Sequence, residues 1–246
     1  MRAIVLAAGQ GKRLRSDRFP LPKVLREVGG RPLISYVLDS IGFISKKDTY
    51  IVAGYMKEKV MESVGGEYKY CVQDKQLGTG HAVAMAREAF SGYSGDVLVL
   101  YGDMPLVKQA TYESVIERHK QSGADCTLLT ADVQNPPAYG RIVRDARGNL
   151  TDIVEDKDAD ELQKKITELN VGIYAFKSPK LFGALGKLKN ENAQGEYYLT
   201  DVPKIFTREG HRVDSYTVYN STEIYGVNTE EDLAFCEKEL RIRGVI

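Results

Sequence analysis

The first stretch that could do chemistry is the loop Leu6 to Arg13, with the sequence LAAGQGKR. Its Ala and Gly side chains are small, so a ligand can approach the backbone N–H groups closely. Consecutive amides that point inward form a concavity for an anion. Arg13 lies at the end of this loop and Lys23 follows it, which adds two fixed positive charges. The combination predicts a polyphosphate site.

Two better-known phosphate motifs are absent. The dinucleotide fingerprint requires a third glycine at position 14, where the chain has Leu14. The P-loop requires glycine at position 6 and Ser or Thr at position 13, where Leu6 and Arg13 stand. For a G-x-G alone, an ordinary strand-to-helix turn is the simpler interpretation. The two cations favour the phosphate site.

The elements around this loop alternate between strand and helix patterns. Residues 3–6 form a short apolar run, as expected of a strand buried on both faces of a parallel sheet. Further strands are predicted at 50–53, 68–72, 96–101 and 125–130, and helices at 32–41, 57–64 and 109–121. Such repeats predict an α/β fold with a Rossmann-like, mostly parallel sheet flanked by helices. Ligands bind such sheets at the carboxyl ends of the strands.

The strand predicted at 96–101 delivers Gly102 and Asp103 to that edge. Mg²⁺ takes one or two carboxylates and leaves its other positions to phosphate oxygens and water, so Asp103 is suited to a metal beside a phosphate site. The alternative is that Asp103 caps the turn before Pro105. A short extended piece is predicted at 24–28, between the loop and the first helix.

From about residue 132 the pattern changes. Residues 141–144 and 150–154 are separated by a glycine-containing turn and predict a hairpin, which adds antiparallel strands to a parallel core. Residues 202–209 read as a helix that Thr200 could cap, and 213–218 as an edge strand. The last helix is predicted at about 230–243. Thr229 and Asp232 form a capping-box pattern at its start.

Composition excludes several classes of protein. A chain of 246 residues buries about 70–75% of its extended surface, so a large core is available. Lys plus Arg and Asp plus Glu both number 34, so the chain lacks the net positive charge that is typical of nucleic-acid-binding proteins. The cysteines, Cys71, Cys126 and Cys236, lack metal or redox spacing and are predicted to be buried. No signal peptide or membrane-spanning run is found, so we expect a cytoplasmic protein without a membrane partner.

Four segments carry a resemblance to a known family. The loop Leu6 to Arg13, followed by Pro22-Lys23-Val24-Leu25, resembles the signature of the sugar-1-phosphate nucleotidylyltransferases. Residues 76–81, 101–103 and 192–201 resemble the uridylyltransferase domain of the bacterial bifunctional enzyme that makes UDP-N-acetylglucosamine. The resemblance extends from Met1 to about the last helix.

The resemblance implies a fold of the nucleotide-diphospho-sugar transferase type, with an antiparallel sugar-binding lobe. It implies one nucleotidylyltransferase domain over residues 1–228, followed by a C-terminal helix at 229–246. Residues 1–132 would form the nucleotide-binding part and residues 133–228 the sugar-binding part. The implied reaction is the Mg²⁺-dependent transfer of a uridylyl group from UTP to N-acetylglucosamine 1-phosphate, a step of nucleotide-sugar and cell-wall synthesis.

The resemblance also implies roles for individual residues. Arg13 and Lys23 match catalytic positions, and Asp103 and Asn228 match the two protein ligands of Mg²⁺. The nucleotide-binding positions are Leu6, Ala7, Ala8, Gly9, Gln73, Gly78 and Thr79. The sugar-binding positions are Tyr101, Gly102, Gly140, Glu155, Asn170, Tyr198 and Thr200.

Gln73 would contact the base. Its primary amide carries both a donor and an acceptor, so it can pair with N3–H and O4 of uracil. The amide could also flip to suit cytosine. Gln73 alone therefore does not select the base, and uridine is implied by the resemblance only.

The chain departs from the family in three places. Arg18-Phe19-Pro20 resembles an insertion in the loop that joins the two cations, and Val171 stands where the family usually has Thr. The bifunctional enzymes continue into a β-helix of hexapeptide repeats that performs acetyl transfer and assembles trimers. This chain stops at Ile246, so no acetyltransferase activity is expected, and the oligomeric state is not determined by the sequence.

Two alternatives remain at this stage. The substrates could be another sugar 1-phosphate, or CTP or dTTP in place of UTP. A different class would be a non-catalytic nucleotide-sugar sensor. Such a protein should have lost its charged chemistry, whereas Arg13, Lys23, Asp103 and Asn228 are all present.

Overall fold

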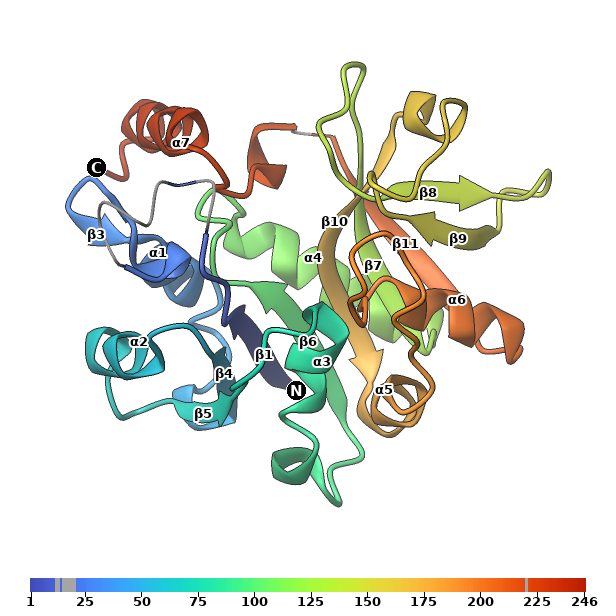
Figure 1. The fold of residues 1–246 in the computed structure, drawn as a ribbon, viewed down its shortest axis with the longest axis horizontal. Coiled ribbons are helices and arrows are strands. Elements are labelled where there is room, and N and C mark those ends of the chain that lie inside the picture. The colour runs from blue at the N-terminus through green and yellow to red at the C-terminus, as the bar shows by residue number, and fades with distance from the viewer. Residues whose placement is uncertain (12–13, 15–20, 220) are drawn as a thin grey trace.

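The computed structural model describes residues 1–11, 14, 21–219 and 221–246 (Figure 1). Its described part contains one large mixed sheet with the strand order β11-β7-β10-β6-β1-β4-β5, to which β8 and β9 are attached through β10. The strands are β1 (Arg2–Ala7), β4 (Thr49–Ala53), β5 (Lys69–Val72), β6 (Asp96–Tyr101), β7 (Cys126–Asp132), β8 (Arg141–Arg144), β9 (Leu150–Val154), β10 (Glu168–Lys177) and β11 (Val213–Val218). The helices are α1 (Leu33–Ser40), α2 (Lys57–Val64), α3 (Thr79–Ala84), α4 (Gln109–Ser122), α5 (Ser178–Leu185), α6 (Asp201–Arg208) and α7 (Glu230–Ile242).

Helices cover both faces of the sheet. Successive side chains of a strand point to opposite faces, so a strand that is apolar throughout contributes to a hydrophobic cluster on each face. In β1, Ala3, Val5 and Ala7 belong to the hydrophobic cluster that includes residues of α1, α2 and α4. Ile4 and Leu6 belong to the cluster on the other face, with residues of α3, α5 and α6. β1 is thus buried on both faces and pairs in parallel with β4 and β6, as the sequence predicted.

β10 lies in the centre of the sheet and is not predicted by the sequence pattern. It runs antiparallel to β6 on one side and to β7 on the other. Its residues are buried almost throughout, but Asn170 and Gly172 interrupt the apolar run and conceal the strand pattern. Because β10 is antiparallel, its N-terminal end lies at the same sheet edge as the carboxyl ends of β1 and β6.

The predicted hairpin of β8 and β9 is confirmed with the predicted bounds. It is attached to the sheet where Arg141 of β8 pairs with Leu169 of β10. In Figure 1 the hairpin stands beside β10 and β11, away from β1, β4 and β5. β11 lies at one edge of the sheet, also as predicted, and β5 lies at the other.

The extended piece predicted at 24–28 is partly wrong. Lys23–Leu25 form a 3-10 turn, because the N–H groups of Leu25 and Arg26 donate to the carbonyls of Pro22 and Lys23. Only then does the chain extend, as β2 (Glu27–Val28), which pairs with β3 (Arg31–Pro32). The turn places the side chain of Lys23 at the edge of the sheet that holds the site.

The capping box predicted for the last helix is confirmed. The backbone N–H of Asp232 donates to Oγ1 of Thr229, and the N–H of Thr229 donates to Oδ2 of Asp232. The predicted burial of Cys71, Cys126 and Cys236 is also confirmed. No helix in the described ranges is long and apolar enough to span a membrane.

Gly172 allows a close contact between β10 and β6. Its φ is +87°, and a Cβ atom placed on it would lie 2.3 Å from a ring carbon of Tyr101. The register of β10 against β7 shifts between Asn170 and Tyr174, so Gly172 lies within a bulge.

We predict that Gly172→Ala lowers the free energy of unfolding by roughly 1–3 kcal/mol, because alanine at positive φ is strained and its methyl group collides with Tyr101. Gly183→Ala is the matched control, since Gly183 lies in α5 with open space around it. The control should gain about 0.5–1 kcal/mol from helix propensity. Urea denaturation measures both. Equal stability of the two variants would contradict this account of the bulge.

Candidate functional site

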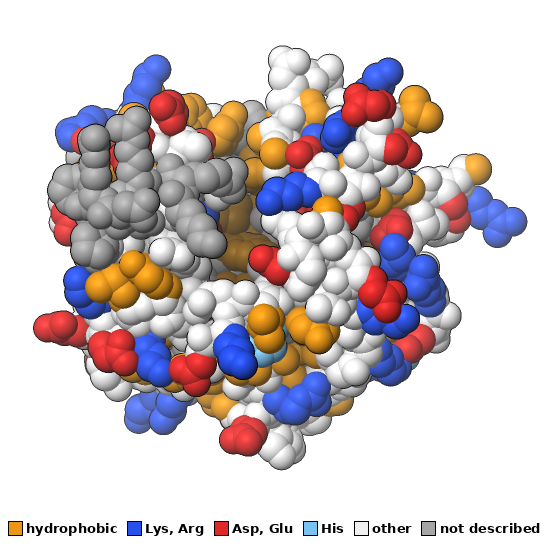
Figure 2. All heavy atoms as spheres, viewed as in Figure 1, with side chains coloured by type: hydrophobic (Ala, Val, Ile, Leu, Met, Phe, Trp, Pro, Cys, Tyr) orange, Lys and Arg blue, Asp and Glu red, His pale blue; other side chains and the backbone are white. Residues whose placement is uncertain are grey.

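A cavity of about 470 Å³ opens at the carboxyl ends of β1 and β6. Figure 2 shows the molecule hollowed near the centre of the face viewed. Of the residues singled out from the sequence, the cavity is lined by Leu6, Ala8, Gly9, Lys23, Gln73, Gly78, Thr79, Tyr101, Asp103, Gly140, Glu155, Asn170, Tyr198 and Asn228. Ala7, Gly102 and Thr200 do not line it. Arg13 and the insertion Arg18-Phe19-Pro20 lie outside the described residues.

A charged cluster lines this cavity. The Lys23 ammonium forms an ion pair with Oδ2 of Asp103 and donates a hydrogen bond to Oδ1 of Asn228 at 2.9 Å. The Lys23 and Asp103 side chains are only 16% and 14% exposed. Because charges so far removed from water need compensation, each charged group depends on the other.

The backbone brings these three side chains together. The N–H of Gly102 donates to the carbonyl of Leu6 at 2.9 Å, which ties the end of β6 to the end of β1. The N–H of Val227 donates to the carbonyl of Asp103 at 3.0 Å. The residue after Val227 is Asn228, so the segment entering α7 is held against the end of β6.

The donor set of this cluster fits a hard divalent cation. Asp103 offers a carboxylate and Asn228 an amide oxygen, which are ligand types that Mg²⁺ accepts. Both are already bound by a cation, the Lys23 ammonium, so the arrangement attracts positive charge. Among the described residues, no group of three or more His, Cys, Asp or Glu side chains could hold a metal. A metal here would therefore take its remaining ligands from a substrate and water.

The small loop after β1 lies on one side of this cluster. A Cβ atom on Gly9 would meet nothing within 4 Å, so a ligand can approach the backbone there. Gly11 has a φ of +72°, and a Cβ on it would lie 2.9 Å from the Cβ of Lys23. Glycine at position 11 thus lets the loop and the Lys23 turn pack together.

Gln73 lies at one end of the cavity, after β5, and is almost completely buried. Its Nε2 donates to the carbonyl of Gly78 at 3.1 Å. Thr79 follows, and its Oγ1 accepts a hydrogen bond from the N–H of Leu199 at 3.0 Å. The loop 76–80 therefore both lines the cavity and contacts the segment that leads into α6.

Polar groups from residues 133–228, the part that contains the β8–β9 hairpin and is named the hairpin lobe, also line the cavity. Thr200 donates its hydroxyl hydrogen to Oε1 of Glu155 at 2.8 Å, so its side chain does not cap α6. Nδ2 of Asn170 donates to the hydroxyl of the buried Tyr174 at 2.7 Å. Thr200 and Tyr174 thus orient Glu155 and Asn170 from outside the cavity.

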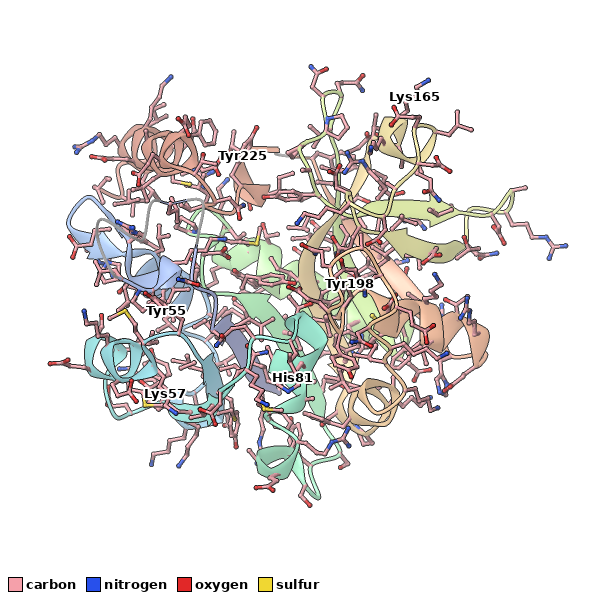
Figure 3. All side chains as sticks on the ribbon, in the orientation of Figure 1. Tyr55, Lys57, His81, Lys165, Tyr198 and Tyr225 are labelled. Carbon is pink, nitrogen blue, oxygen red and sulfur yellow. The ribbon has the colours of Figure 1, made fainter. Side chains whose placement is uncertain are left out.

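Tyr198 lies beside these groups and is labelled in Figure 3. Burial raises the pKa of Tyr198 to about 12, although a hydrogen bond from Nε2 of Gln194 to its hydroxyl opposes the shift. Tyr198 therefore presents a neutral hydroxyl in the wall of the cavity.

Several lining residues were not singled out from the sequence: Val24, Ala82, Met104, Ala138, Gly172, Gln194, Glu196 and Gly226. Most are small or apolar, so their types carry no chemical signal. Gln194 and Glu196 stood inside the segment 192–201 that carried the resemblance. The resemblance could have marked both residues as candidates. It could not have shown which side chains of the segment face the cavity.

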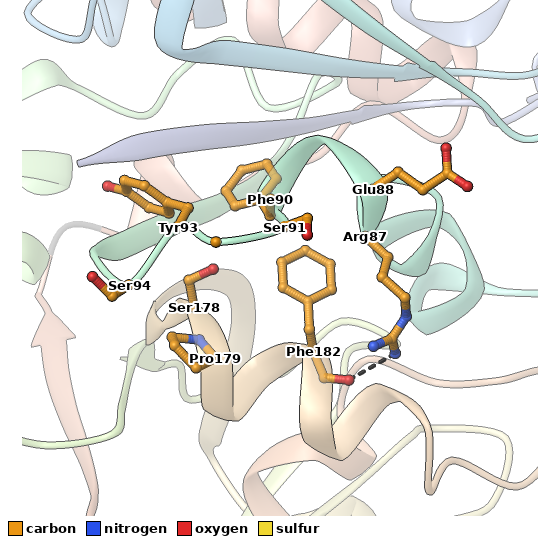
Figure 4. A pocket seen from close by; sticks show the side chains of 10 residues that line it. Arg87, Glu88, Phe90, Ser91, Tyr93, Ser94, Ser178, Pro179 and Phe182 are labelled. Atoms are coloured by element: carbon orange, nitrogen blue, oxygen red, sulfur yellow. Dashed lines mark hydrogen bonds between the residues drawn. The ribbon is translucent and has the colours of Figure 1, made fainter.

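A second hollow, of about 760 Å³, lies elsewhere on the molecule, between the turn 88–90 and α5 (Figure 4). Its lining includes the rings of Phe90, Tyr93 and Phe182. A guanidinium nitrogen of Arg87 donates to the carbonyl of Phe182 at 2.7 Å. None of the residues predicted to do chemistry lies there, so the polar cavity is the candidate site.

Comparison with known sequences identifies the family. The sequence profile of the family described as nucleotidyl transferase matches residues 2–220. The chain belongs to the nucleotidyl transferase family. This confirms the resemblance stated from the loop Leu6 to Arg13 and the three later segments.

Curated relatives in this family share much of the sequence. The chain is 45% identical over 241 residues to the bifunctional protein GlmU of Pelotomaculum thermopropionicum, and 46% identical to that of Heliobacterium modesticaldum. Both matches cover 98% of this chain and 52% of the relative. The chain thus spans about half the length of the curated relatives that it matches.

A solved structure shows the same fold as this nucleotidyl transferase. It is a crystal structure from Bacillus anthracis, provisionally described as a glucose-1-phosphate thymidylyltransferase in complex with a sucrose. The TM-score is 0.78, the sequence identity is 22%, and the match covers 98% of this chain and 95% of that chain. The mostly parallel sheet flanked by helices is therefore the architecture of a known fold.

Glu155 gives this site a pH-dependent effect on stability. Burial raises the pKa of Glu155, the hydroxyl of Thr200 opposes the shift, and the nearby Asp158, Asp201 and Asp156 add to it. A carboxyl whose folded pKa is raised binds its proton more tightly in the folded state. Its contribution to stability is present below the unfolded pKa and is lost as pH rises through the folded pKa.

We predict that Glu155→Gln, which keeps the acceptor for Thr200, stabilises the protein more at about pH 8 than at about pH 4. Urea denaturation at both pH values measures the difference. Glu62→Gln on the exposed side of α2 is the control and should show a pH-independent difference. If Glu155→Gln showed no greater gain at the higher pH than the control, the carboxyl would not be desolvated as the geometry indicates.

Proposed function

We propose that the chain transfers a uridylyl group from UTP to N-acetylglucosamine 1-phosphate, which yields UDP-N-acetylglucosamine and pyrophosphate. The observation that carries this proposal is one cavity with three connected parts. The Lys23, Asp103 and Asn228 cluster, Gln73 with Gly78 and Thr79, and Glu155 with Asn170 all line this one cavity. The identity of 45–46% to proteins named GlmU supports the choice of substrates.

The proposal divides the chain as the sequence suggested. Residues 1–132 contribute the loop after β1, Gln73 and Asp103, and would bind the nucleotide. Residues 133–228 contribute Glu155 and Asn170, and would bind the sugar. The helix in 229–246 would hold Asn228 through Asp232, whose Oδ2 accepts the N–H of Asn228 at 2.8 Å, while the N–H of Val227 binds the carbonyl of Asp103.

The proposed reaction needs no nucleophile from the protein. A phosphate oxygen of the sugar 1-phosphate forms a bond to the α-phosphorus of UTP. The bond from that phosphorus to the bridging oxygen breaks, and pyrophosphate leaves with the electron pair. The protein has to align two polyanions and offset their charge, so catalysis would come from positioning and electrostatics.

Lys23 and Arg13 would supply fixed positive charge. The Lys23 side chain already lines the cavity, where its ammonium would contact both reacting phosphates. Arg13 would hold the triphosphate tail and the leaving group. Its role rests on the sequence, because it lies outside the described residues.

Asp103 and Asn228 would hold Mg²⁺, and both offer oxygen ligands beside the phosphate region. When bound, Mg²⁺ supplies positive charge that neutralises phosphate oxygens. The same carboxylate and amide oxygen hold the Lys23 ammonium in this structure, so they are suited to a cation.

The lobe would recognise the sugar. Glu155 would accept hydrogen bonds from sugar hydroxyls, and Thr200 would keep its carboxylate oriented. Asn170 would contact the acetamido group or a hydroxyl, oriented by Tyr174. Val171 lines the cavity without a hydroxyl, so the sugar would meet an apolar contact where the family usually has Thr.

The direct test measures pyrophosphate release by the purified chain over a grid of nucleoside triphosphates and sugar 1-phosphates. We expect release with UTP and N-acetylglucosamine 1-phosphate, none when either is omitted, and none after removal of divalent metal until Mg²⁺ is restored. Release with another pair would replace the substrates and keep the reaction. If no pair of substrates released pyrophosphate while a nucleotide sugar still bound, the proposed catalytic activity would be wrong.

A second test removes charges from the cluster. Lys23→Ala and Asp103→Ala should each lower turnover by about two orders of magnitude or more, because a preorganised charge that stabilises a transition state is worth roughly 3 kcal/mol. Lys57→Ala and Asp74→Ala are matched controls, since those residues form a surface ion pair at 2.9 Å. Circular dichroism checks folding. Turnover at the control level in either cluster variant would rule out its proposed role.

A further inference from the structure

The amide of Gln73 has one fixed orientation. Its Nε2 donates to the carbonyl oxygen of Gly78 at 3.1 Å and lies 3.0 Å from Nδ1 of His81. A primary amide has two N–H groups, and these two partners use both. The oxygen Oε1 is therefore the only atom of this amide that can meet a base in the cavity.

The carbonyl of Gly78 prevents the amide from flipping. A backbone carbonyl only accepts hydrogen bonds, so Oε1 in place of Nε2 would face another lone pair. That carbonyl is itself immobilised, because it also accepts the N–H of Ala82 at 3.0 Å in the first turn of α3. The loop around it is tied on both sides of Gly78: the N–H of Tyr197 donates to Leu77, and the N–H of Gly80 donates to Tyr197, both at 2.8 Å.

His81 supplies the second acceptor. It lies on α3 and is labelled in Figure 3. It is not among the residues that line the cavity, so it reaches the nucleotide end only through Gln73. Because Nε2 of Gln73 brings a hydrogen, Nδ1 of His81 has to present a lone pair, with the ring proton on its other nitrogen. Burial lowers the pKa of His81 and so favours this neutral form.

The Oε1 atom of Gln73 would distinguish pyrimidine bases by the group at ring position 3. Uracil and thymine carry an N–H there, which can donate to Oε1. Cytosine carries a lone pair at that position, which Oε1 would repel. From the sequence alone Gln73 could serve either base. The two partners of its nitrogen remove that ambiguity.

We propose that His81 is a positioning residue for base selection: with the carbonyl of Gly78, it holds the Gln73 amide so that the site accepts a base with N3–H and rejects cytosine. The inference deepens the proposed function and rests on its nucleotide site. Discrimination arises from the hydrogen-bond partners of Gln73: Gly78, which lines the cavity, and His81, which does not.

The test measures dissociation constants of UTP and CTP by titration calorimetry with Mg²⁺, which requires no turnover. Wild type should bind UTP at least about tenfold more tightly than CTP. His81→Leu removes the acceptor and should reduce that preference about 2- to 10-fold, the worth of one hydrogen bond. His81→Asn keeps an oxygen close to the position of Nδ1 and should restore the wild-type preference.

An equal preference in wild type, His81→Leu and His81→Asn would overturn the role of His81 and leave the proposed function standing. Failure of wild type to bind UTP would overturn both. The tautomer provides a readout that needs no variant: ¹⁵N spectra of the histidine ring should show an unprotonated Nδ1 for His81. A proton on that nitrogen would also overturn the inference.

Discussion

The contact of Lys23 with Asp103 and Asn228 holds together three segments that are far apart in the chain. Lys23 belongs to the turn after the first loop, Asp103 follows β6, and Asn228 precedes α7. Charges this far removed from water are stable only when they are paired with an opposite charge, so losing one partner leaves the other uncompensated. The site is therefore assembled when the sheet edge, the turn and the last helix are all in place.

The topology of the sheet explains why two kinds of recognition meet at this cluster. Parallel strands β1 and β6 end at one edge and deliver the loop after β1 and Asp103. The antiparallel β10 begins at the same edge, and its Asn170, at the start of the bulge around Gly172, lines the cavity. The antiparallel strand in the centre of the sheet, β10, thus connects the β8–β9 hairpin to the edge where β1 and β6 end.

Sequence reasoning succeeded where structure is decided locally. The apolar run of β1, the hairpin of β8 and β9, and the capping box of α7 are set by neighbours within a few residues, so their patterns were readable. It failed at β10, because Asn170 and Gly172 break the apolar run and only pairing with β6 and β7 identifies the strand. It also failed at residues 24–25, where local hydrogen bonds favour a turn over an extended piece.

By itself the sequence determined the residue types, the order of the motifs and the family, because those depend only on identity and spacing along the chain. The tertiary structure alone decided how side chains share their hydrogen bonds. Thr200 could have capped α6, yet its hydroxyl donates to Glu155. The Gln73 amide could have presented either its oxygen or its nitrogen to a base, yet its nitrogen contacts Gly78 and His81. A donor can satisfy only the acceptors that folding brings within about 3 Å, and sequence spacing does not contain that distance.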